Sequence, residues 1–330
     1  MSTHQKVDHR QTDSVQRYRA FGMVIESDIP LSLPEAAHGD PQDPSGVGVF
    51  RVRHASSSET PQPTHYPYSV GGFPYHVDSK RRITISVPQR GRLHIPDPDT
   101  LIVDLPDTAE ARIDSYVVGL ALPFALRLRP IIALHGSAVR TPAHTEDARP
   151  CAVVLLGMQG SGKSTTAAML AARGMPLLCD DVVPVRPPED ARVAEVMPGI
   201  PVSKLLPDAY EKLTGTAPEP QDFDGIDKYR RFGPASYRNA ELTTAIILEP
   251  DAESDATRAQ QLTGATKLAA LSAHGLVLEG IDHAPAQLGM LAQIANGLPV
   301  YRILRPKRAD TRDDVCEVIE SLLEEQLHSG

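Results

Sequence analysis

Several short stretches in the first third of the chain alternate hydrophobic and polar residues with the period of two that is typical of β-strands. One strand is predicted in "YRAFGMVIESDIPL", which stops before Pro30, and others are predicted at 46–54, 81–87 and 100–105. Prolines and polar segments such as "SSSETPQPTHYP" separate them as loops. The pattern predicts a β-rich domain over 18–108, after a disordered polar tail at 1–17. Because no catalytic group of side chains stands out there, we interpret this domain as a recognition or packing unit.

The rest of the chain mixes helical and strand patterns. Apolar residues follow helical spacing over 109–128, and Pro123 should kink or divide that helix. Further on, the strands we predict are "IIALHGSAVR", "CAVVLLG", "MPLLCDD", "ELTTAIILEP" and "VYRILRP". The helices we predict are "KSTTAAMLAARG", "TGATKLAALSAHG" and "DDVCEVIESLLEEQLH". This mixture favours an α/β domain over 109–330.

The charge and the distribution of apolar residues and cysteines limit the partners and the cellular location that we expect for the protein. The net charge of −9 argues against broad attraction to nucleic acid or to an anionic membrane surface. The longest apolar run, 116–126, is shorter than the roughly 20 residues that a membrane helix needs. The first residues lack the apolar core of a signal peptide, and the three cysteines have no metal-ligand spacing. We therefore expect a cytoplasmic protein without nucleic-acid or membrane partners; its oligomeric state stays open, a homo-oligomer included.

One motif carries specific chemistry. Residues 157–164, "GMQGSGKS", fit the phosphate-loop pattern G-x-x-x-x-G-K-[ST], with an apolar strand before it and a helix after it. Glycines let backbone amides turn toward a phosphate, a lysine reaches the β- and γ-phosphates, and a hydroxyl can ligate Mg²⁺. The alternative is a glycine-rich turn, which the flanking elements disfavour. The pattern thus predicts binding of ATP and Mg²⁺ by Gly157, Gly160, Ser161, Gly162, Lys163, Ser164 and Thr165.

Two adjacent aspartates, Asp180 and Asp181, follow the next apolar strand. Acidic side chains beside a phosphate loop commonly hold Mg²⁺ or orient a nucleophile. Neighbouring residues of a strand point to opposite faces, so the two carboxylates should divide these tasks unless the strand ends between them. Capping of a turn is the alternative for such a pair.

The stretch "GSGKSTTAAMLAARGMPLLCDD", together with "LHGSAV" upstream, resembles the catalytic core of HPr kinase/phosphorylase, a family distantly similar in fold to the ATP-dependent phosphoenolpyruvate carboxykinases. The resemblance implies a phosphate-loop kinase domain in which Asp181 is the general base and His135 assists it. It also implies that Lys163 serves the phosphates, with Ser164 and Asp180 at the metal. Glu195 and Asp224 are candidates for the downstream metal-binding glutamate of that family.

Segments outside the core, "YRAFG", "PGIPVSKLLPDA" and "DKYRRF", resemble HPr-kinase-like proteins that phosphorylate the C-terminal serine of lasso-peptide precursors. This similarity implies a kinase that acts on a serine or threonine hydroxyl of a peptide or small protein. Four basic residues could contact a phosphate or the substrate, or could simply lie on the surface. They are Lys204, Lys228, Arg230 and Arg231.

Other functions stay open at this point. One alternative is a bifunctional HPr kinase/phosphorylase, and another is a carboxykinase-like or other small-molecule phosphotransferase. A third, from a different class, is a non-catalytic module that changes shape when it binds a nucleotide. The acidic pair and the upstream histidine favour chemistry over binding alone.

Overall fold

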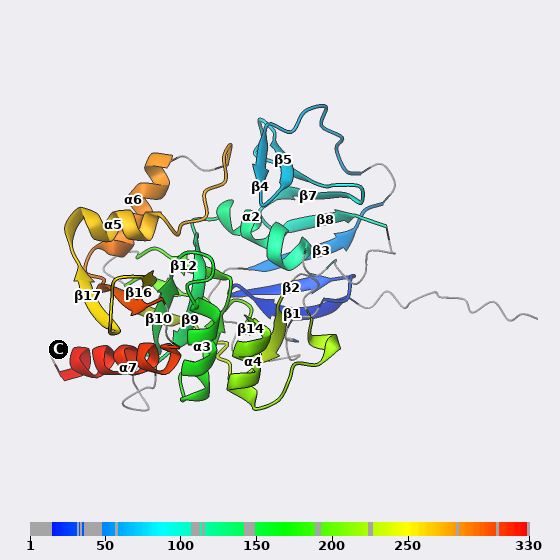
Figure 1. Ribbon diagram of the computed structural model, residues 1–330. Helices are drawn as coiled ribbons and strands as arrows, with labels where there is room; N and C mark the ends of the chain where they lie inside the picture. The colour runs from blue at the N-terminus through cyan, green and yellow to red at the C-terminus, as the bar shows by residue number, and fades with distance from the viewer. Residues whose placement is uncertain are drawn as a thin grey trace, which may run out of the picture.

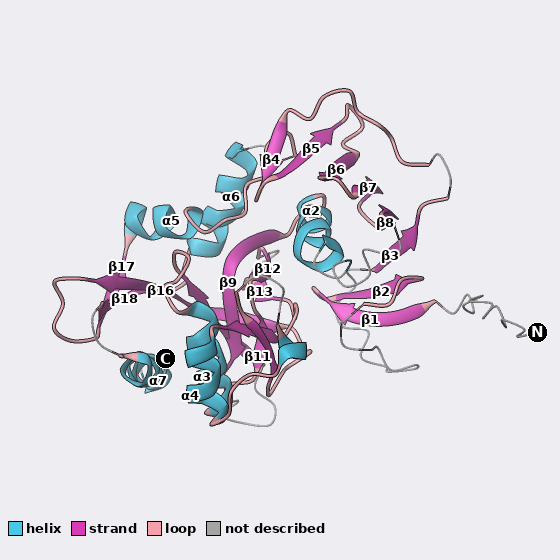
Figure 2. Cartoon of the chain, turned by 45° about the vertical axis from the view of Figure 1, so that its right-hand side comes forward, coloured by secondary structure: helices cyan, strands magenta, loops and turns pink. Residues whose placement is uncertain are grey.

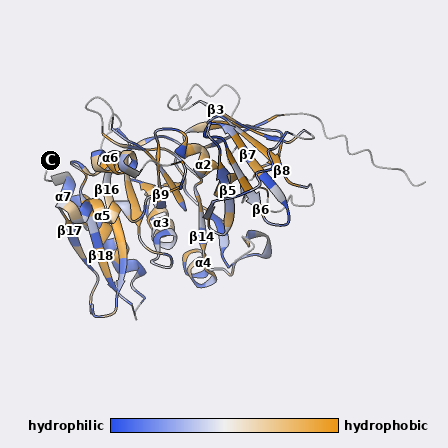
Figure 3. Cartoon of the chain, turned by 90° about the horizontal axis from the view of Figure 1, so that it is seen from above, coloured by the Kyte–Doolittle hydropathy of each residue, from blue (hydrophilic) through white to orange (hydrophobic). Residues whose placement is uncertain are grey.

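In the computed structural model, two large β-sheets lie side by side, the first formed by the N-terminal third of the chain and the second by the remainder (Figure 1). The structure describes residues 15–31, 33, 35, 48–56, 59–106, 113, 116–141, 149–188, 193–223, 227–281, 284–307 and 310–328. Hydrophobic stretches are concentrated in the sheet strands, as Figure 3 shows by colour. The mixed α/β class that the sequence predicts agrees with this architecture.

The first sheet has the strand order β1-β2-β3-β8-β7-β6-β5-β4 within the described residues. Pairing is parallel between β2 and β3 and between β3 and β8, and antiparallel elsewhere. Its strands are β1 (Gln16–Ala20), β2 (Met23–Ser27), β3 (Val49–His54), β4 (Tyr68–Val70), β5 (Phe73–Val77), β6 (Ile83–Val87), β7 (Gly91–Asp97) and β8 (Thr100–Asp104). The predicted strands at 46–54, 81–87 and 100–105 are confirmed as β3, β6 and β8.

The first predicted strand is instead a hairpin. Phe21 and Gly22 both have positive φ, 56° and 69°, which is the backbone of a two-residue type I′ turn. Phe-Gly is not one of the usual turn signals. The alternation of hydrophobic and polar residues therefore predicted one continuous strand where the structure has two strands and a turn. β1 also begins at Gln16, two residues earlier than predicted; residues 1–14 of the predicted tail lie outside the described residues.

A helix covers the first sheet. It starts as a π-helical turn, η2 (Val117–Ala121), and continues as α2 (Leu122–Arg127) with Pro123 in its first turn. The change of helix type next to Pro123 agrees with the predicted division. The helix lies against the first sheet in Figure 2, and its apolar side chains belong to the core of that sheet. Phe124 meets Tyr75 edge-on, with the ring centroids 4.9 Å apart. This helix, which the sequence analysis grouped with the C-terminal domain, therefore packs with the N-terminal strands.

The second sheet has the strand order β10-β9-β12-β13-β16-β18-β17, with β11 paired to β9 and a further parallel pairing of β10 with β16. Its strands are β9 (Ile132–Arg140), β10 (Cys151–Leu156), β11 (Leu177–Cys179), β12 (Val182–Arg186), β13 (Glu195–Val196), β16 (Ala240–Asp251), β17 (Arg258–Leu262) and β18 (Val300–Pro306). Around it lie α3 (Lys163–Ala172), α4 (Pro207–Thr214), η3 (Pro220–Asp222), α5 (Gly264–Ser272), α6 (Ala284–Ala295), α7 (Arg312–His328) and the ribbon β14 (Val202–Leu205) with β15 (Tyr229–Phe232).

Three strands converge on one point of the second sheet. β10 ends at Leu156, where the phosphate loop begins, and β9 runs antiparallel beside it with Gly136 opposite Leu156. β11 pairs with β9 from the other side and ends at Cys179, directly before the aspartate pair. The tip of the β9–β10 connection, 142–148, lies outside the described residues. This convergence brings "LHGSAV", the phosphate loop and the two aspartates together.

The two halves meet through backbone and side-chain contacts. The amide of Gly22 in the first hairpin donates to the carbonyl of Pro198, 3.0 Å away, and the Tyr75 hydroxyl donates to the carbonyl of Glu279 at 2.9 Å. Met197 and Ile281 from the second half are buried in the core of the first sheet. The first sheet is therefore fixed next to the strands that carry the aspartates.

Gly136 should be required for this convergence, because a Cβ atom there would lie 2.5 Å from the backbone oxygen of Leu155. We expect Gly136→Ala to lower the free energy of unfolding by about 1–3 kcal/mol, the usual cost of overpacking. Gly289→Ala on α6 is the control, since nothing lies within 4 Å of its Cβ position. Urea unfolding of both variants measures the difference; equal stability would contradict this packing.

Candidate active site

The loop between β10 and α3 has the backbone of an anion cradle. Gly157, Gly160 and Gly162 all have positive φ, at 145°, 78° and 100°. A Cβ on Gly157 would lie 2.6 Å from the carbonyl oxygen of Leu248 on the neighbouring strand, so only glycine fits there. The loop ends in the first turn of α3, whose free amides and positive dipole end favour a phosphate. The backbone of this loop is thus suited to an anion, and phosphate binding by it stays a prediction.

Lys163 folds back over this loop. Its Nζ donates to the carbonyls of Gly157 (2.8 Å) and Met158 (3.2 Å), and the residue is buried. Burial lowers the pKa of the ammonium, an effect that the nearby Asp180 and Asp181 carboxylates oppose. A bound phosphate would supply the negative charge that favours the charged lysine. The lysine is therefore positioned for an anion held in the loop.

Asp180 is buried at the centre of a hydrogen-bond cluster. Its Oδ1 accepts from the hydroxyls of Ser137 (2.6 Å) and Ser164 (3.0 Å), and its Oδ2 accepts from the backbone amide of Lys204 (3.1 Å). Burial raises the pKa of this carboxyl group, although the hydrogen bonds act in the opposite direction. A cation beside the carboxylate would favour its ionised form. Asp180 thus faces the phosphate loop.

Asp181 points away from Asp180 because the chain turns at this pair, between the end of β11 at Cys179 and the start of β12 at Val182. Its φ of 73° and the hydrogen bond from Val182 N to Asp180 O (2.9 Å) have the pattern of a γ-turn with positive φ, a rare and strained conformation. Strain of this kind in a non-glycine residue concentrates at functional sites. One carboxylate thus faces the loop and the other turns toward His135 and Lys204, while the division of tasks between them stays a prediction.

Two neighbours hold the Asp181 side chain, which is half exposed. The Nδ1 atom of His135 lies 3.4 Å from its carboxylate and 3.1 Å from its carbonyl oxygen, and the ammonium of Lys204 lies 3.1 Å from the carboxylate. The hydrogen bond with His135, followed by the charge of Lys204, holds the pKa of Asp181 well below its usual range, while burial opposes the shift. Asp181 is consequently ionised at neutral pH.

Ser137 was not among the predicted site residues, although its spacing from His135 could have indicated it. In "LHGSAV", His135 and Ser137 are two residues apart on β9, so both side chains lie on the same face of the strand. That face meets the aspartate pair. His274, whose backbone carbonyl accepts from the amide of His135 at 2.8 Å, gave no comparable signal because it is distant in sequence. Burial lowers the pKa of the His274 imidazole.

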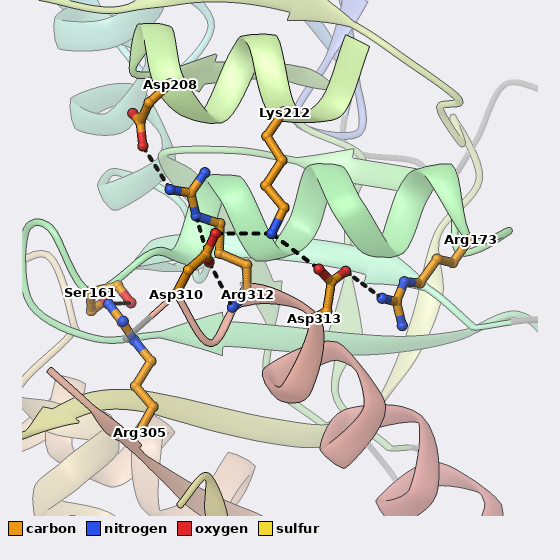
Figure 4. A network of polar contacts seen from close by, with 8 residues as sticks. All are labelled: Ser161, Arg173, Asp208, Lys212, Arg305, Asp310, Arg312 and Asp313. Atoms are coloured by element: carbon orange, nitrogen blue, oxygen red, sulfur yellow. Dashed lines mark hydrogen bonds and ion pairs between the residues drawn. The ribbon is translucent and has the colours of Figure 1, made fainter. Parts of the chain in front are cut away.

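Arg305, also missed, comes from the end of β18. Its guanidinium donates to the carbonyl of Ser161 in the phosphate loop at 3.2 Å, and burial lowers its pKa. Figure 4 shows this arginine beside an ionic network that joins α3, α4 and the start of α7. Pairs of the network are Asp208–Arg312 (2.7 Å), Lys212–Asp310 (3.0 Å), Lys212–Asp313 (3.1 Å) and Arg173–Asp313 (2.9 Å).

Some predicted candidates lie elsewhere. Glu195 is on β13 and pairs with Arg186 at 3.0 Å, at the far end of β12 from Asp181, so it is no part of this site. Asp224 lies outside the described residues. Thr165 lines a separate cavity between α3, α4 and α7. The hydroxyl of Ser161 is buried and has no hydrogen-bond partner among the described residues.

The donors at the loop suit Mg²⁺. This ion prefers oxygen ligands and usually keeps several waters, with one or two protein groups and substrate phosphates completing its shell. Ser164 and Asp180 supply a hydroxyl and a carboxylate side by side. In the part of the chain that the structure describes, no cluster of three or more His, Cys, Asp or Glu side chains is arranged to hold a metal. The same described residues contain no helix long and apolar enough to cross a bilayer.

Comparison with known proteins gives similarity to solved structures only. No protein-family model matches the chain, and no curated protein sequence matches it. Among solved structures, the chain is similar to the HPr(Ser) kinase/phosphatase from Coxiella burnetii, with 14% sequence identity and a TM-score of 0.30 over 60% of this chain and 94% of the other. At this TM-score the similarity supports no inference about function, so we base the functional inference on the residues of the site.

We expect Lys163→Met to weaken MgATP binding by at least tenfold, because the loop loses its only ammonium among the described residues while the apolar part of the side chain is kept. Lys267→Met is the matched control, since its ammonium also donates to a backbone carbonyl, that of Leu298 at 2.9 Å. Isothermal titration calorimetry measures both. Equal affinities would mean that phosphates bind elsewhere.

Proposed function

We propose that the protein is an ATP- and Mg²⁺-dependent kinase that transfers the γ-phosphoryl group to a serine or threonine hydroxyl of a peptide or small protein. The observation that carries this proposal is the 3.0 Å hydrogen bond between Ser164 of the phosphate loop and Asp180. It holds Asp180 against the phosphate loop, and the ionised carboxylate of Asp181 belongs to the next residue of the chain. This proximity supports a site in which a carboxylate accepts a proton beside a bound phosphate.

Different residues of the site can serve the phosphoryl transfer and the proton transfer. The hydroxyl oxygen of the acceptor forms a bond to the γ-phosphorus while the bond from that phosphorus to the β–γ bridging oxygen breaks, and ADP leaves. The proton of the hydroxyl passes to the carboxylate of Asp181. Because the transition state of phosphoryl transfer is loose, a weakly basic carboxylate is sufficient and positioning matters more. Bound Mg²⁺ would supply positive charge beside Ser164 and Asp180.

Cations around Asp181 can stabilise the charge that develops. Lys204 already contacts the carboxylate, and Arg230 lies opposite Lys204 in the β14–β15 ribbon. Arg230 has no partner among the described residues, so it is available to the transferring phosphoryl group. His135 positions Asp181 by holding both its carbonyl and its carboxylate.

The acceptor is the finer part of the proposal. The resemblance of "YRAFG", "PGIPVSKLLPDA" and "DKYRRF" to HPr-kinase-like proteins supports the C-terminal serine of a lasso-peptide precursor as one specific candidate. The three widely spaced cysteines, which lack metal-ligand spacing, support a cytoplasmic protein. A module that binds ATP without transfer is the competing function, and the strained, ionised Asp181 favours catalysis over it.

We expect Asp181→Asn to reduce phosphorylation by about 10²–10⁴-fold, because an amide cannot accept the proton. Affinity for MgATP should change little, since Asp181 turns away from the loop. The control is Asp99→Asn, a change at an exposed aspartate of the β7–β8 turn whose carboxylate pairs with Arg129. The assay follows transfer from γ-labelled ATP to serine-containing peptides.

Two results of this assay count against the proposal. Undiminished transfer by Asp181→Asn would remove Asp181 from the reaction. Tight MgATP binding by the unmodified protein, without transfer to any serine- or threonine-containing peptide, would leave the non-catalytic module as the function.

A further inference from the structure

A cavity of about 110 Å³ opens next to Asp181 and has one polar and one apolar side. Its polar side is formed by the aspartate pair, Lys204 and Arg230. The apolar lining consists of Val118, Val182, Ile200, Val202 and Phe232, with Gly119 beside them. A cavity of about 150 Å³ in another protein holds a benzene molecule, so this one is of the size of a single large side chain.

The register of the β14–β15 ribbon explains why one of its faces forms the cavity wall. Val202 lies opposite Phe232, and Lys204 lies opposite Arg230. Side chains alternate between faces, so all four residues lie on the same face. The opposite face carries Leu205, which is buried against α3 and α4. The ribbon therefore presents two apolar side chains and two cations to the cavity, with the cations nearer the aspartates.

The other wall comes from the N-terminal half. Val118 and Gly119 lie in the π-helical turn that packs on the first sheet. Turns of this type are frequent at functional sites. Nothing lies within 4 Å of a Cβ placed on Gly119, so the cavity has room at this point. The first sheet thus helps to shape the space in front of Asp181.

Phe232 is unusually exposed for a phenylalanine. It ends the ribbon strand β15 with 67% of its surface accessible, at the edge of the cavity, where the other apolar lining residues are aliphatic. A large exposed aromatic residue beside an apolar hollow is a feature of binding surfaces. Because Asp181 lines the same cavity, a molecule that presents a hydroxyl to Asp181 has this apolar surface within reach of its neighbouring atoms.

We propose that this cavity selects the acceptor by binding a large apolar side chain adjacent to the phosphorylated hydroxyl. The hydroxyl lies at the polar side, and the neighbouring leucine-like or phenylalanine-like side chain lies between Phe232, Val202 and Gly119. This inference rests on the proposed kinase function, which it extends to a class of acceptor. It also gives the N-terminal half a function, because that half supplies one wall.

Four synthetic octapeptides test the proposal. Each has one serine among glycines, with leucine before the serine, after it, on both sides or on neither. Transfer from ATP and equilibrium binding are measured separately. We expect at least one leucine peptide to exceed the all-glycine peptide by tenfold or more in kcat/KM and in affinity. Equal values for all four peptides would overturn the proposal.

Two variants locate the selection in the cavity. Gly119→Leu fills the open space and should reduce the leucine preference to about onefold. Gly289→Leu introduces the same side chain at an exposed, open position of α6 and should keep the preference. Phe232→Ser, a change at an exposed residue, should lower the preference without disturbing the core. A preference that survives in both Gly119→Leu and Phe232→Ser would overturn the assignment.

The two readouts separate this inference from the kinase proposal. Leucine-dependent binding without transfer would support the cavity and contradict the kinase. Transfer without leucine preference would support the kinase and contradict the cavity. Neither transfer nor binding would contradict both.

Discussion

The hydrogen bond between the Ser164 hydroxyl and Asp180 joins two pieces of the chain that could otherwise act independently. On one side is a loop whose glycines and lysine suit a phosphate, and on the other is a carboxylate pair with opposite orientations. Asp180 is buried, and its three hydrogen bonds come from β9, α3 and β14. Breaking such a cluster would leave a buried carboxylate with unsatisfied oxygens, which is costly. The site is therefore fixed by the same contacts that give it chemistry.

The arrangement of the second sheet makes this interaction possible. β9 contacts both β10 and β11, and it can approach β10 closely because Gly136 has no side chain. The phosphate loop and the aspartates follow the ends of the two flanking strands. The first sheet is held against this centre by the hairpin at Gly22 and by the helix that carries Gly119. The phosphate loop thus lies wholly in the second half, whereas the cavity next to Asp181 takes one wall from each half.

Much of the site could be predicted because its signals are local. The phosphate loop is a continuous motif with a strand before it and a helix after it, and Asp180–Asp181 follow within one strand. Other site residues were harder to predict from the sequence because their positions depend on tertiary contacts; these are Lys204, Ser137 and Arg305. Lys204, for example, contacts Asp181 because the β14–β15 ribbon places it there. The strand β1–β2 was misread because Phe21 adopts a positive φ that its residue type disfavours.

A double-mutant cycle between Ser164→Ala and Asp180→Asn, read out as the free energy of MgATP binding, tests the central claim most directly. If the two side chains form one site, the effects of the two substitutions will not add. We predict a coupling energy of about 1–3 kcal/mol, as expected for residues in one hydrogen-bond network. Additive effects, with a coupling energy below about 0.5 kcal/mol, would contradict the claim that the phosphate loop and the carboxylate pair form a single site.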